Sequence, residues 1–185
     1  MALKKTLTIA GSDTSAGAGM QADLKTFQEL GTYGIVALTS IVTMDKKSWS
    51  HDVTPIPFDV FEKQLETAIS IGPDAVKTGM LGTQEIIKRA GDAYVESGAD
   101  YFVVDPVMVC KGENEVLNPG NTDAMIEYLL PKATVVTPNL FEAGQLANLG
   151  TLKSIEDMKK AAEVIHEQGA KHVIIKGGKA LDQDK

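Results

Sequence analysis

Six short apolar runs of the sequence are each followed at once by glycines or by polar side chains that could do chemistry. Those side chains include carboxylates, an amide and a lysine, which together suit phosphoryl transfer assisted by a divalent cation. The six groups are Gly11-Ser12-Asp13, Thr43-Met44-Asp45, Thr78-Gly79-Met80, Asp105-Pro106-Val107, Thr137-Pro138-Asn139 with Glu142 behind it, and Lys176-Gly177-Gly178.

Several of these groups also have a purely structural explanation. Asn139 and Glu142 have the spacing of a capping box at the start of a helix. Asp105 precedes a proline, and the residue before a proline avoids helical conformation, so it could simply mark the end of a strand. Lys176-Gly177-Gly178 is typical of a surface turn as well as of a phosphate site. Spacing alone leaves these alternatives open.

Asp23 is a further candidate, in the first turn of a predicted helix. A carboxylate is favoured there by the helix dipole. It lies three residues after Met20 and four before Phe27, at the edge of the apolar face of that helix. A carboxylate in such a place is either well paired or functional.

The runs that carry these groups predict a mostly parallel sheet. TLTIA, YFVVD and HVIIK are apolar almost throughout, as in strands buried on both faces. Amphipathic segments alternate with them, which predicts right-handed βαβ units with helices on both faces. Strands are expected at residues 6–10, 35–42, 75–77, 101–105, 134–136 and 172–176, and helices at 20–30, 58–71, 83–97, 122–130 and from Ser154 onward.

The side chains named above then meet at one edge of the sheet. In open α/β sheets, ligands bind beyond the carboxyl ends of the strands. The polar segment 44–57 breaks the pattern and is expected to be a flap or an extra β excursion beside that edge.

The stretch AGSDTSAGAGMQADLKTF, residues 10–27, matches the G-x-G-x-x-A dinucleotide fingerprint at Gly17, Gly19 and Ala22. That fingerprint needs its first glycine directly after the strand, yet Gly17 comes seven residues after Ala10. The expected acidic residue is also misplaced, and no lysine follows to make a Walker loop. A nicotinamide-binding oxidoreductase is therefore disfavoured, and the glycines are expected to let the backbone approach a small ligand.

Composition sets the class of protein. The 185 residues are 43% hydrophobic and 23% charged, as expected for one globular domain spanning 1–185. The net charge of −7 argues against a protein that binds nucleic acid or a membrane surface. Cys110 is the only cysteine, so no intrachain disulfide can form, which fits the cytoplasm. The sequence shows neither a signal peptide nor a run long enough to span a membrane.

Six ordered motifs carry a family resemblance along essentially the whole chain. They are TIAGSDTSAGAGMQADLKTF, GTYG, VKTGMLG, VVDPVM, TPNLFEA and IIKGG. The sequence resembles the hydroxymethylpyrimidine (phosphate) kinases and the related bacterial pyridoxal kinases of the ribokinase-like superfamily. The resemblance implies a three-layer α/β/α fold with a mostly parallel central sheet, ATP as co-substrate, Mg²⁺ as cofactor and a homodimer.

The resemblance also implies roles for individual residues. The vitamin ring would be bound by Gly11, Asp23, Met44, His51, Met80 and Val107. ATP would be bound by Asn139, Lys176, Gly177, Gly178, Lys179 and Ala180, and Mg²⁺ by Glu142, through water, with Asp105 nearby.

Met44 is the position that bears on the substrate. The pyrimidine kinases usually carry a glutamine there, whose amide can pair with an aminopyrimidine, whereas a thioether cannot donate a hydrogen bond. The expected reaction is therefore ATP-dependent phosphorylation of the hydroxymethyl group of pyridoxal, pyridoxine or pyridoxamine. The alternatives are a hydroxymethylpyrimidine (phosphate) kinase, dual activity, or a vitamin-binding protein that has lost catalysis.

Members of this family continue well past residue 185, to a Gly-rich anion hole of the GTG type that carries the catalytic residue. No such motif occurs in these residues. The catalytic residue is therefore expected beyond Lys185, in a C-terminal part that this chain lacks. A molecule that ended there is expected to be inactive.

Overall fold

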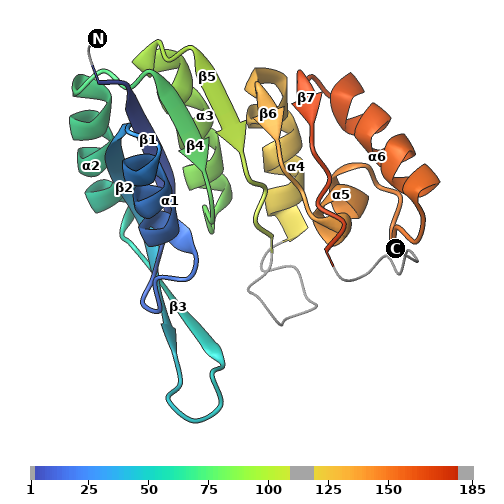
Figure 1. The fold of residues 1–185 in the computed structure, drawn as a ribbon, viewed down its shortest axis with the longest axis horizontal. Coiled ribbons are helices and arrows are strands. Elements are labelled where there is room, and N and C mark those ends of the chain that lie inside the picture. Colours follow the sequence, from blue (N-terminus) through green and yellow to red (C-terminus); the bar gives the residue numbers. More distant parts are fainter. Residues whose placement is uncertain (1–2, 109–118, 179–185) are drawn as a thin grey trace.

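The computed structural model describes residues 3–108 and 119–178, and these form a sheet of seven strands (Figure 1). The strand order is β3-β2-β1-β4-β5-β6-β7, with β2 and β3 antiparallel and every other pair parallel. The strands are β1 Lys5–Asp13, β2 Tyr33–Met44, β3 His51–Pro55, β4 Ala75–Thr78, β5 Tyr101–Val104, β6 Val135–Val136 and β7 His172–Val173.

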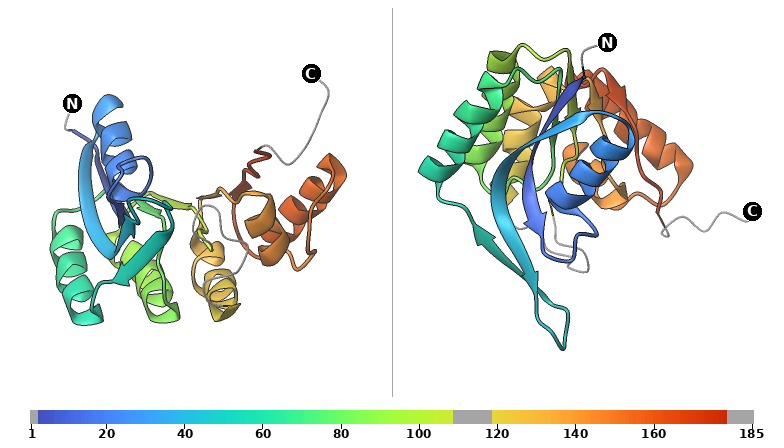
Figure 2. Two further views of the ribbon diagram at one scale, coloured as in Figure 1. Left: turned by 90° about the horizontal axis from the view of Figure 1, so that it is seen from below. Right: turned by 60° about the vertical axis from the view of Figure 1, so that its left-hand side comes forward.

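Helices lie on both faces of the sheet (Figure 2). One face carries α1, which packs on β1 and β2. The other carries a row in which α2, α3, α4, α5 and α6 each contact the next. The helices are α1 Gly19–Glu29, α2 Phe58–Ser70, α3 Gln84–Ser97, α4 Pro119–Tyr128, α5 Leu140–Leu146 and α6 Ile155–Glu167, with a 3₁₀ turn at Leu130–Lys132. The expected α/β/α architecture is confirmed.

The apolar runs form the centre of the molecule, as expected. Leu7 and Ile9 of β1 and Phe102 and Val104 of β5 are all fully buried, because helices or neighbouring strands cover them. Tyr94 of α3 stacks on Phe102 with ring centroids 4.6 Å apart, which fixes α3 against the middle of the sheet. Among the described residues, no helix combines the length and the apolar character that crossing a bilayer requires.

The topology creates a crevice beside β1. The chain leaves β1 for β2 on one side and later returns to β4 on the other side of β1. At such a switch point the two connections diverge, leaving space beyond the carboxyl ends of the strands. The segments that follow β1 and β4 therefore face a common opening.

The strands β1, β5 and β7 end at other residues than predicted. β1 runs on to Asp13 instead of stopping at Ala10, with a register shift between Ala10 and Ser12. Gly17 is consequently only four residues past the strand, which weakens the spacing argument against a dinucleotide site. β5 and β7 are shorter than predicted. After β7 the chain stays beside β6, because the N–H of Ile174 donates to the carbonyl of Val136 and Lys176 forms an isolated bridge with Asn139. The predicted β excursion in residues 44–57 is β3.

Candidate active site

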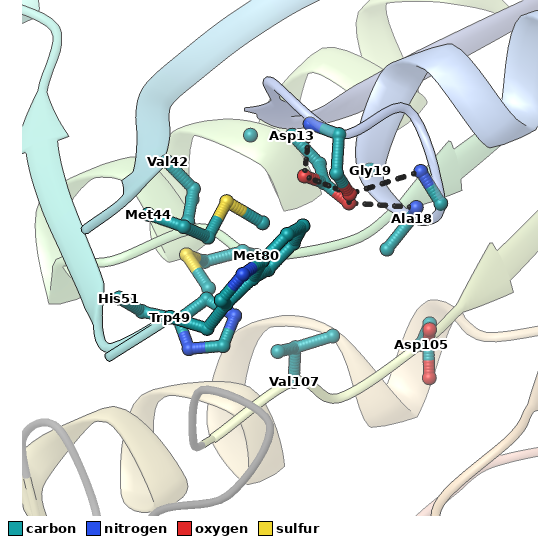
Figure 3. A pocket seen from close by; sticks show the side chains of 13 residues that line it. Asp13, Ala18, Gly19, Val42, Met44, Trp49, His51, Met80, Asp105 and Val107 are labelled. Atoms are coloured by element: carbon teal, nitrogen blue, oxygen red, sulfur yellow. Dashed lines mark hydrogen bonds between the residues drawn. The ribbon is translucent and has the colours of Figure 1, made fainter. Parts of the chain in front are cut away.

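A cavity of about 480 Å³ opens beside the carboxyl ends of β1, β2 and β4 (Figure 3). This volume suits a drug-sized or vitamin-sized molecule. Its walls are mostly apolar, with one carboxylate at each side. The cavity is lined by Gly11, Asp13, Ser15, Gly17, Ala18, Gly19, Val42, Met44, Trp49, His51, Met80, Asp105 and Val107.

Five of the six residues predicted to bind the ring line this cavity: Gly11, Met44, His51, Met80 and Val107. Met44 ends β2 and pairs across the antiparallel ladder with His51, so the β2–β3 hairpin supplies one wall. Met80 follows β4 and Val107 follows β5, as the predicted edge of the sheet requires. The structure thus brings these five residues together from four segments distant in sequence.

The glycine-rich loop approaches β1 more closely than any side chain would allow. Gly19 has a positive φ of 60°, and a Cβ atom placed on it would lie 2.5 Å from the carbonyl oxygen of Gly11. A residue with a side chain would therefore meet both backbone strain and a steric clash. The loop and the start of α1 can lie against β1 because these positions are glycine.

Asp13, at the end of β1, organises this loop. Its carboxylate accepts hydrogen bonds from the N–H and hydroxyl of Ser15 and from the N–H of Ala18, at 2.8–3.0 Å. Burial alone would raise the pKa of Asp13, but these hydrogen bonds together with one from Gly17 outweigh it and lower the pKa. An ionised carboxylate therefore lies at the cavity wall and at the N-terminus of α1, where the helix dipole favours it.

Asp23 does not line the cavity. One of its carboxylate oxygens accepts a 2.6 Å hydrogen bond from the hydroxyl of Thr8 on β1, and the ammonium group of Lys77 on β4 lies 3.1 Å from the other. The side chain of Asp23 is only 13% exposed. Of the two alternatives left open by the sequence, the paired carboxylate is the one observed, and the expected contact between Asp23 and the substrate stays a prediction.

Four of the eight residues predicted to bind ATP or Mg²⁺ lie together beside the cavity, and this cluster is called the phosphate end of the site: Asp105, Asn139, Glu142 and Lys176. The ammonium group of Lys176 lies 3.0 Å from the carboxylate of Asp105, which itself lines the cavity. The hydroxyl of Thr137 donates a long 3.4 Å hydrogen bond to the same carboxylate oxygen. The backbone N–H of Lys176 donates to the carbonyl of Pro138, so the segment after β7 is held next to Asn139.

Asn139 and Glu142 form the capping box that their spacing predicts. The side-chain oxygen of Asn139 accepts from the N–H of Glu142 at 2.9 Å, and the carboxylate of Glu142 accepts from the N–H of Asn139 at 2.8 Å. Burial raises the pKa of Glu142 to about 7, and the nearby Asp105 carboxylate adds to this, while hydrogen bonds from Asn139 and Met108 and the charge of Lys176 oppose it. The capping box accounts for the spacing of Asn139 and Glu142, whereas a cap alone does not require a carboxylate with a pKa near 7.

Two predicted nucleotide residues, Lys179 and Ala180, lie outside the described residues, whereas Gly177 and Gly178 follow Lys176 at the edge of the same cluster. Within residues 3–108 and 119–178, no group of three or more histidine, cysteine, aspartate or glutamate side chains converges as a ready-made metal cage. Oxygen donors are nonetheless present in Asp105 and Glu142. Mg²⁺ characteristically uses one or two carboxylates, with water and substrate phosphates completing its shell.

Trp49 is a lining residue that the sequence reasoning did not single out as a ligand contact. It lies at the tip of the β2–β3 hairpin and is the only tryptophan of the sequence. A lone tryptophan in an otherwise polar segment is the signal that could have identified it, because a large apolar side chain in such a segment has no core to enter.

The chain matches the model of the phosphomethylpyrimidine kinase family over residues 13–185. It is 54% identical to a pyridoxine kinase of Bacillus subtilis, covering all of this chain and 69% of that protein. It is 43% identical to a hydroxymethylpyrimidine/phosphomethylpyrimidine kinase of the same organism, covering 96% of this chain and 66% of that protein.

Solved structures agree with this relationship. The pyridoxal kinase of Staphylococcus aureus in complex with AMP-PCP and pyridoxal matches with a TM-score of 0.95 and 79% identity. That match covers all of this chain and 66% of the other, so the chain spans about two thirds of the length of these relatives. The chain belongs to the phosphomethylpyrimidine kinase family, within the ribokinase-like superfamily.

Proposed function

We propose that this protein is a kinase that transfers the γ-phosphoryl group of ATP to the hydroxymethyl group of pyridoxal, pyridoxine or pyridoxamine. One observation carries the proposal. The apolar cavity and the charged cluster around Lys176 share a wall at Asp105, so a ring bound in the first would lie next to phosphates bound in the second. The kinship with pyridoxine and pyridoxal kinases described above supports the same conclusion.

In this proposal the apolar cavity, which we call the ring end of the site, binds and orients the substrate. Met44, Met80 and Val107 offer apolar and polarisable surface to a flat heterocycle. A ring packed against these apolar walls would displace water from them, so the primary hydroxyl would be held in a drier environment for in-line attack on the γ-phosphorus.

The phosphate end would bind ATP. Asn139 and Lys176 would contact its phosphates, with Gly177 and Gly178 beside them, and we extend this role to Lys179 and Ala180. The ammonium group of Lys176 is paired with Asp105 in the structure, and it would turn to the oxygens of the γ-phosphoryl group, where charge develops.

The residues present fit Mg²⁺. The carboxylate of Glu142 is buried and has a pKa near 7, so a divalent cation nearby would favour its ionised form. Asp105 is a second oxygen donor, 25% exposed. Bound there through Glu142, by way of water, and Asp105, Mg²⁺ would offset the negative charge of the ATP phosphates.

Hydroxymethylpyrimidine remains the second candidate substrate, since the more distant of the two Bacillus subtilis relatives is named a hydroxymethylpyrimidine/phosphomethylpyrimidine kinase. Met44 separates the two candidates. It lies on the cavity wall, where its thioether can pack against a methyl-bearing pyridine ring but cannot donate a hydrogen bond to an aminopyrimidine.

The test is ADP release by the full-length protein with Mg²⁺ and ATP, comparing kcat/KM for pyridoxal, pyridoxine and hydroxymethylpyrimidine. We expect the vitamin B6 compounds to give the higher value. A higher kcat/KM for the pyrimidine would establish the second candidate instead. Ring binding without ADP release for any substrate would contradict both kinase assignments.

We also propose that the protein acts in the cytoplasm and forms a homodimer, as the family resemblance implies. Its lack of cysteine pairs is consistent with a reducing compartment. Sedimentation equilibrium of the full-length protein measures the oligomeric state directly, and a monomer mass at micromolar concentration would contradict the homodimer.

A further inference from the structure

Trp49 is a largely exposed tryptophan at the mouth of the candidate site. Its side chain lines the cavity, yet its surface is 65% exposed. Large aromatic side chains are normally buried, and a tryptophan left this open has most of its ring surface available for contact with something else. The contact surface faces a cavity of about 480 Å³, not open solvent alone.

The backbone of Trp49 is held in a strained conformation. Its φ is +58°, in the left-handed region that bulky side chains avoid, and it is one of only three non-glycine residues with positive φ in the described part of the chain. Glycine or asparagine would adopt this turn at lower cost. Strain of this kind persists where the surrounding structure imposes it, and it concentrates at ligand-binding positions.

Asp45 imposes the turn. One oxygen of its carboxylate accepts from the N–H groups of Lys47 and Ser48 at 2.9 and 2.8 Å, and from the hydroxyl of Ser48 at 3.0 Å. Its backbone closes the hairpin tip, because its carbonyl accepts from the N–H of Trp49 at 2.9 Å and its own N–H donates to the carbonyl of Ser50 at 3.0 Å. Asp45 itself does not line the cavity, so it acts only through the turn.

The turn aims the indole across the cavity. In Figure 3, Trp49 extends from the hairpin alongside Met44 and Met80, toward the loop that carries Asp13 and Gly19. The two thioethers form one apolar wall, and the indole presents a flat face beside it. A planar heterocycle in this space would meet the indole face to face or edge to face, which are the geometries that aromatic pairs prefer.

We propose that Trp49 is an aromatic lid that stacks on the ring of the substrate, and that Asp45 is the positioning residue that holds it there. The inference rests on the proposed function only for the nature of the occupant, a planar vitamin ring. A stacked face is indifferent to substituents at the ring edge. Trp49 therefore strengthens binding of pyridoxal, pyridoxine and pyridoxamine alike, whereas Met44 selects between ring types.

The first experiment measures shielding of Trp49. Because the sequence contains one tryptophan, acrylamide quenching of its emission reports this position, with Trp49→Phe protein as the blank for any signal from elsewhere in the full-length protein. Saturating pyridoxine is expected to lower the Stern–Volmer constant about twofold, as a stacked ring covers the indole. AMP-PCP alone is expected to leave it unchanged. Equal accessibility with and without pyridoxine would overturn the proposal, and so would shielding that follows protein concentration, since a second copy would then cover Trp49.

The second experiment separates stacking from folding. Trp49→Ala is expected to raise KM for all three B6 compounds about tenfold with kcat changed less than about twofold, and Trp49→Phe to restore most of the loss. Asp45→Ala keeps the indole but frees the turn, so it is expected to raise KM about threefold and to weaken the shielding. Tyr101→Ala is the matched control. Tyr101 is an aromatic residue that is 58% exposed, and it begins β5, at the amino ends of the strands and away from the cavity.

These outcomes are independent of the kinase assignment. Shielding by pyridoxine without any phosphorylation would uphold the lid and contradict the proposed function. Phosphorylation with an unchanged KM in Trp49→Ala would uphold the proposed function and overturn the lid.

Discussion

The two ends of the candidate site are built by opposite means. At the ring end, backbone geometry forms the space: the Gly11–Gly19 approach, the bonded carboxylate of Asp13 and the hairpin leave a cavity with its walls in place. At the phosphate end, charged side chains neutralise one another, with Lys176 paired to Asp105 and Glu142 held at a raised pKa. The ring end is therefore a preformed cavity, whereas at the phosphate end the charge of one side chain is neutralised by another.

This difference implies different energetic consequences of binding. A ring that enters a preformed apolar cavity gains contacts without breaking any within the protein. In the proposed function, ATP and Mg²⁺ would instead exchange partners with the Lys176–Asp105 ion pair and with Glu142, whose pKa is raised to about 7. Substitutions at the phosphate end should therefore act strongly on catalysis and depend on pH, while those at the ring end should act more weakly and on substrate choice.

Lys176→Met should have the largest effect. It removes the cation proposed to stabilise charge on the γ-phosphoryl group, and loss of a comparable donor elsewhere costs about 10²–10³-fold in rate. We expect kcat/KM for ATP to fall by that order, measured by ADP release. Lys171→Met, an exposed lysine at the start of the same segment, is the matched control and should change the rate little. A fall of less than about tenfold in Lys176→Met would mean that the phosphate end lies elsewhere.

Glu142→Gln should rank second. The amide oxygen can still accept the capping hydrogen bond from Asn139, but the carboxylate proposed to organise Mg²⁺ is gone. Apparent Mg²⁺ affinity should fall about 10–100-fold. Because the pKa of Glu142 is about 7, wild-type activity at limiting Mg²⁺ should rise as pH increases through 7, and the variant should lack that rise. Identical pH profiles would contradict the assignment.

The same group predicts how stability depends on pH without metal. The pKa of Glu142 is raised from 4.5 to about 7 by folding, so its contribution is fully present below pH 4.5 and is lost as pH rises through 7. The full shift corresponds to about 3 kcal/mol. With a chelator present, the Tm of Glu142→Gln relative to wild type should therefore be several degrees higher at pH 8 than at pH 5. A constant difference in Tm would contradict the raised pKa.

Met44→Gln should alter selectivity by about tenfold. A glutamine amide can pair with an aminopyrimidine edge, and one matched hydrogen bond contributes about 1–3 kcal/mol to discrimination. The ratio of kcat/KM for hydroxymethylpyrimidine to that for pyridoxal should rise. Met80→Gln is the matched control on another wall of the cavity and should lower both values together. Equal shifts in the two variants would show that polarity alone, and not position, determines the preference.

Much of the ring end was predictable from the sequence. The residues that follow parallel strands all lie at the same edge of the sheet, beyond the carboxyl ends of the strands. The periodicity places Met44, Met80 and Val107 there without any structure. The β-bulge after Ala10 and the extension of β1 to Asp13 were not predictable, because they depend on pairing with β2 across the sheet. The left-handed turn at Trp49 likewise depends on hydrogen bonds to Asp45 that composition does not reveal.

Asp23 is a single side chain whose role could not be predicted from the local sequence either. Its sequence position, at the edge of an apolar helical face, fits both a paired carboxylate and a substrate contact. The choice depends on Lys77, 54 positions later in the sequence and adjacent only because β4 pairs with β1. Local patterns identify a carboxylate that needs a partner, but only the sheet topology identifies the partner.

Asp23→Asn should therefore have the smallest effect on the reaction. The amide keeps an oxygen for Thr8 but loses the charge that pairs with Lys77, so stability should fall while KM for pyridoxal stays within about twofold. A double-mutant cycle with Lys77→Met should give a coupling energy of about 1 kcal/mol, measured from denaturant unfolding, because the pair is only partly exposed. If instead KM rose tenfold with stability unchanged, Asp23 would contact the ring directly, and the ring end would rely on charge as much as the phosphate end does.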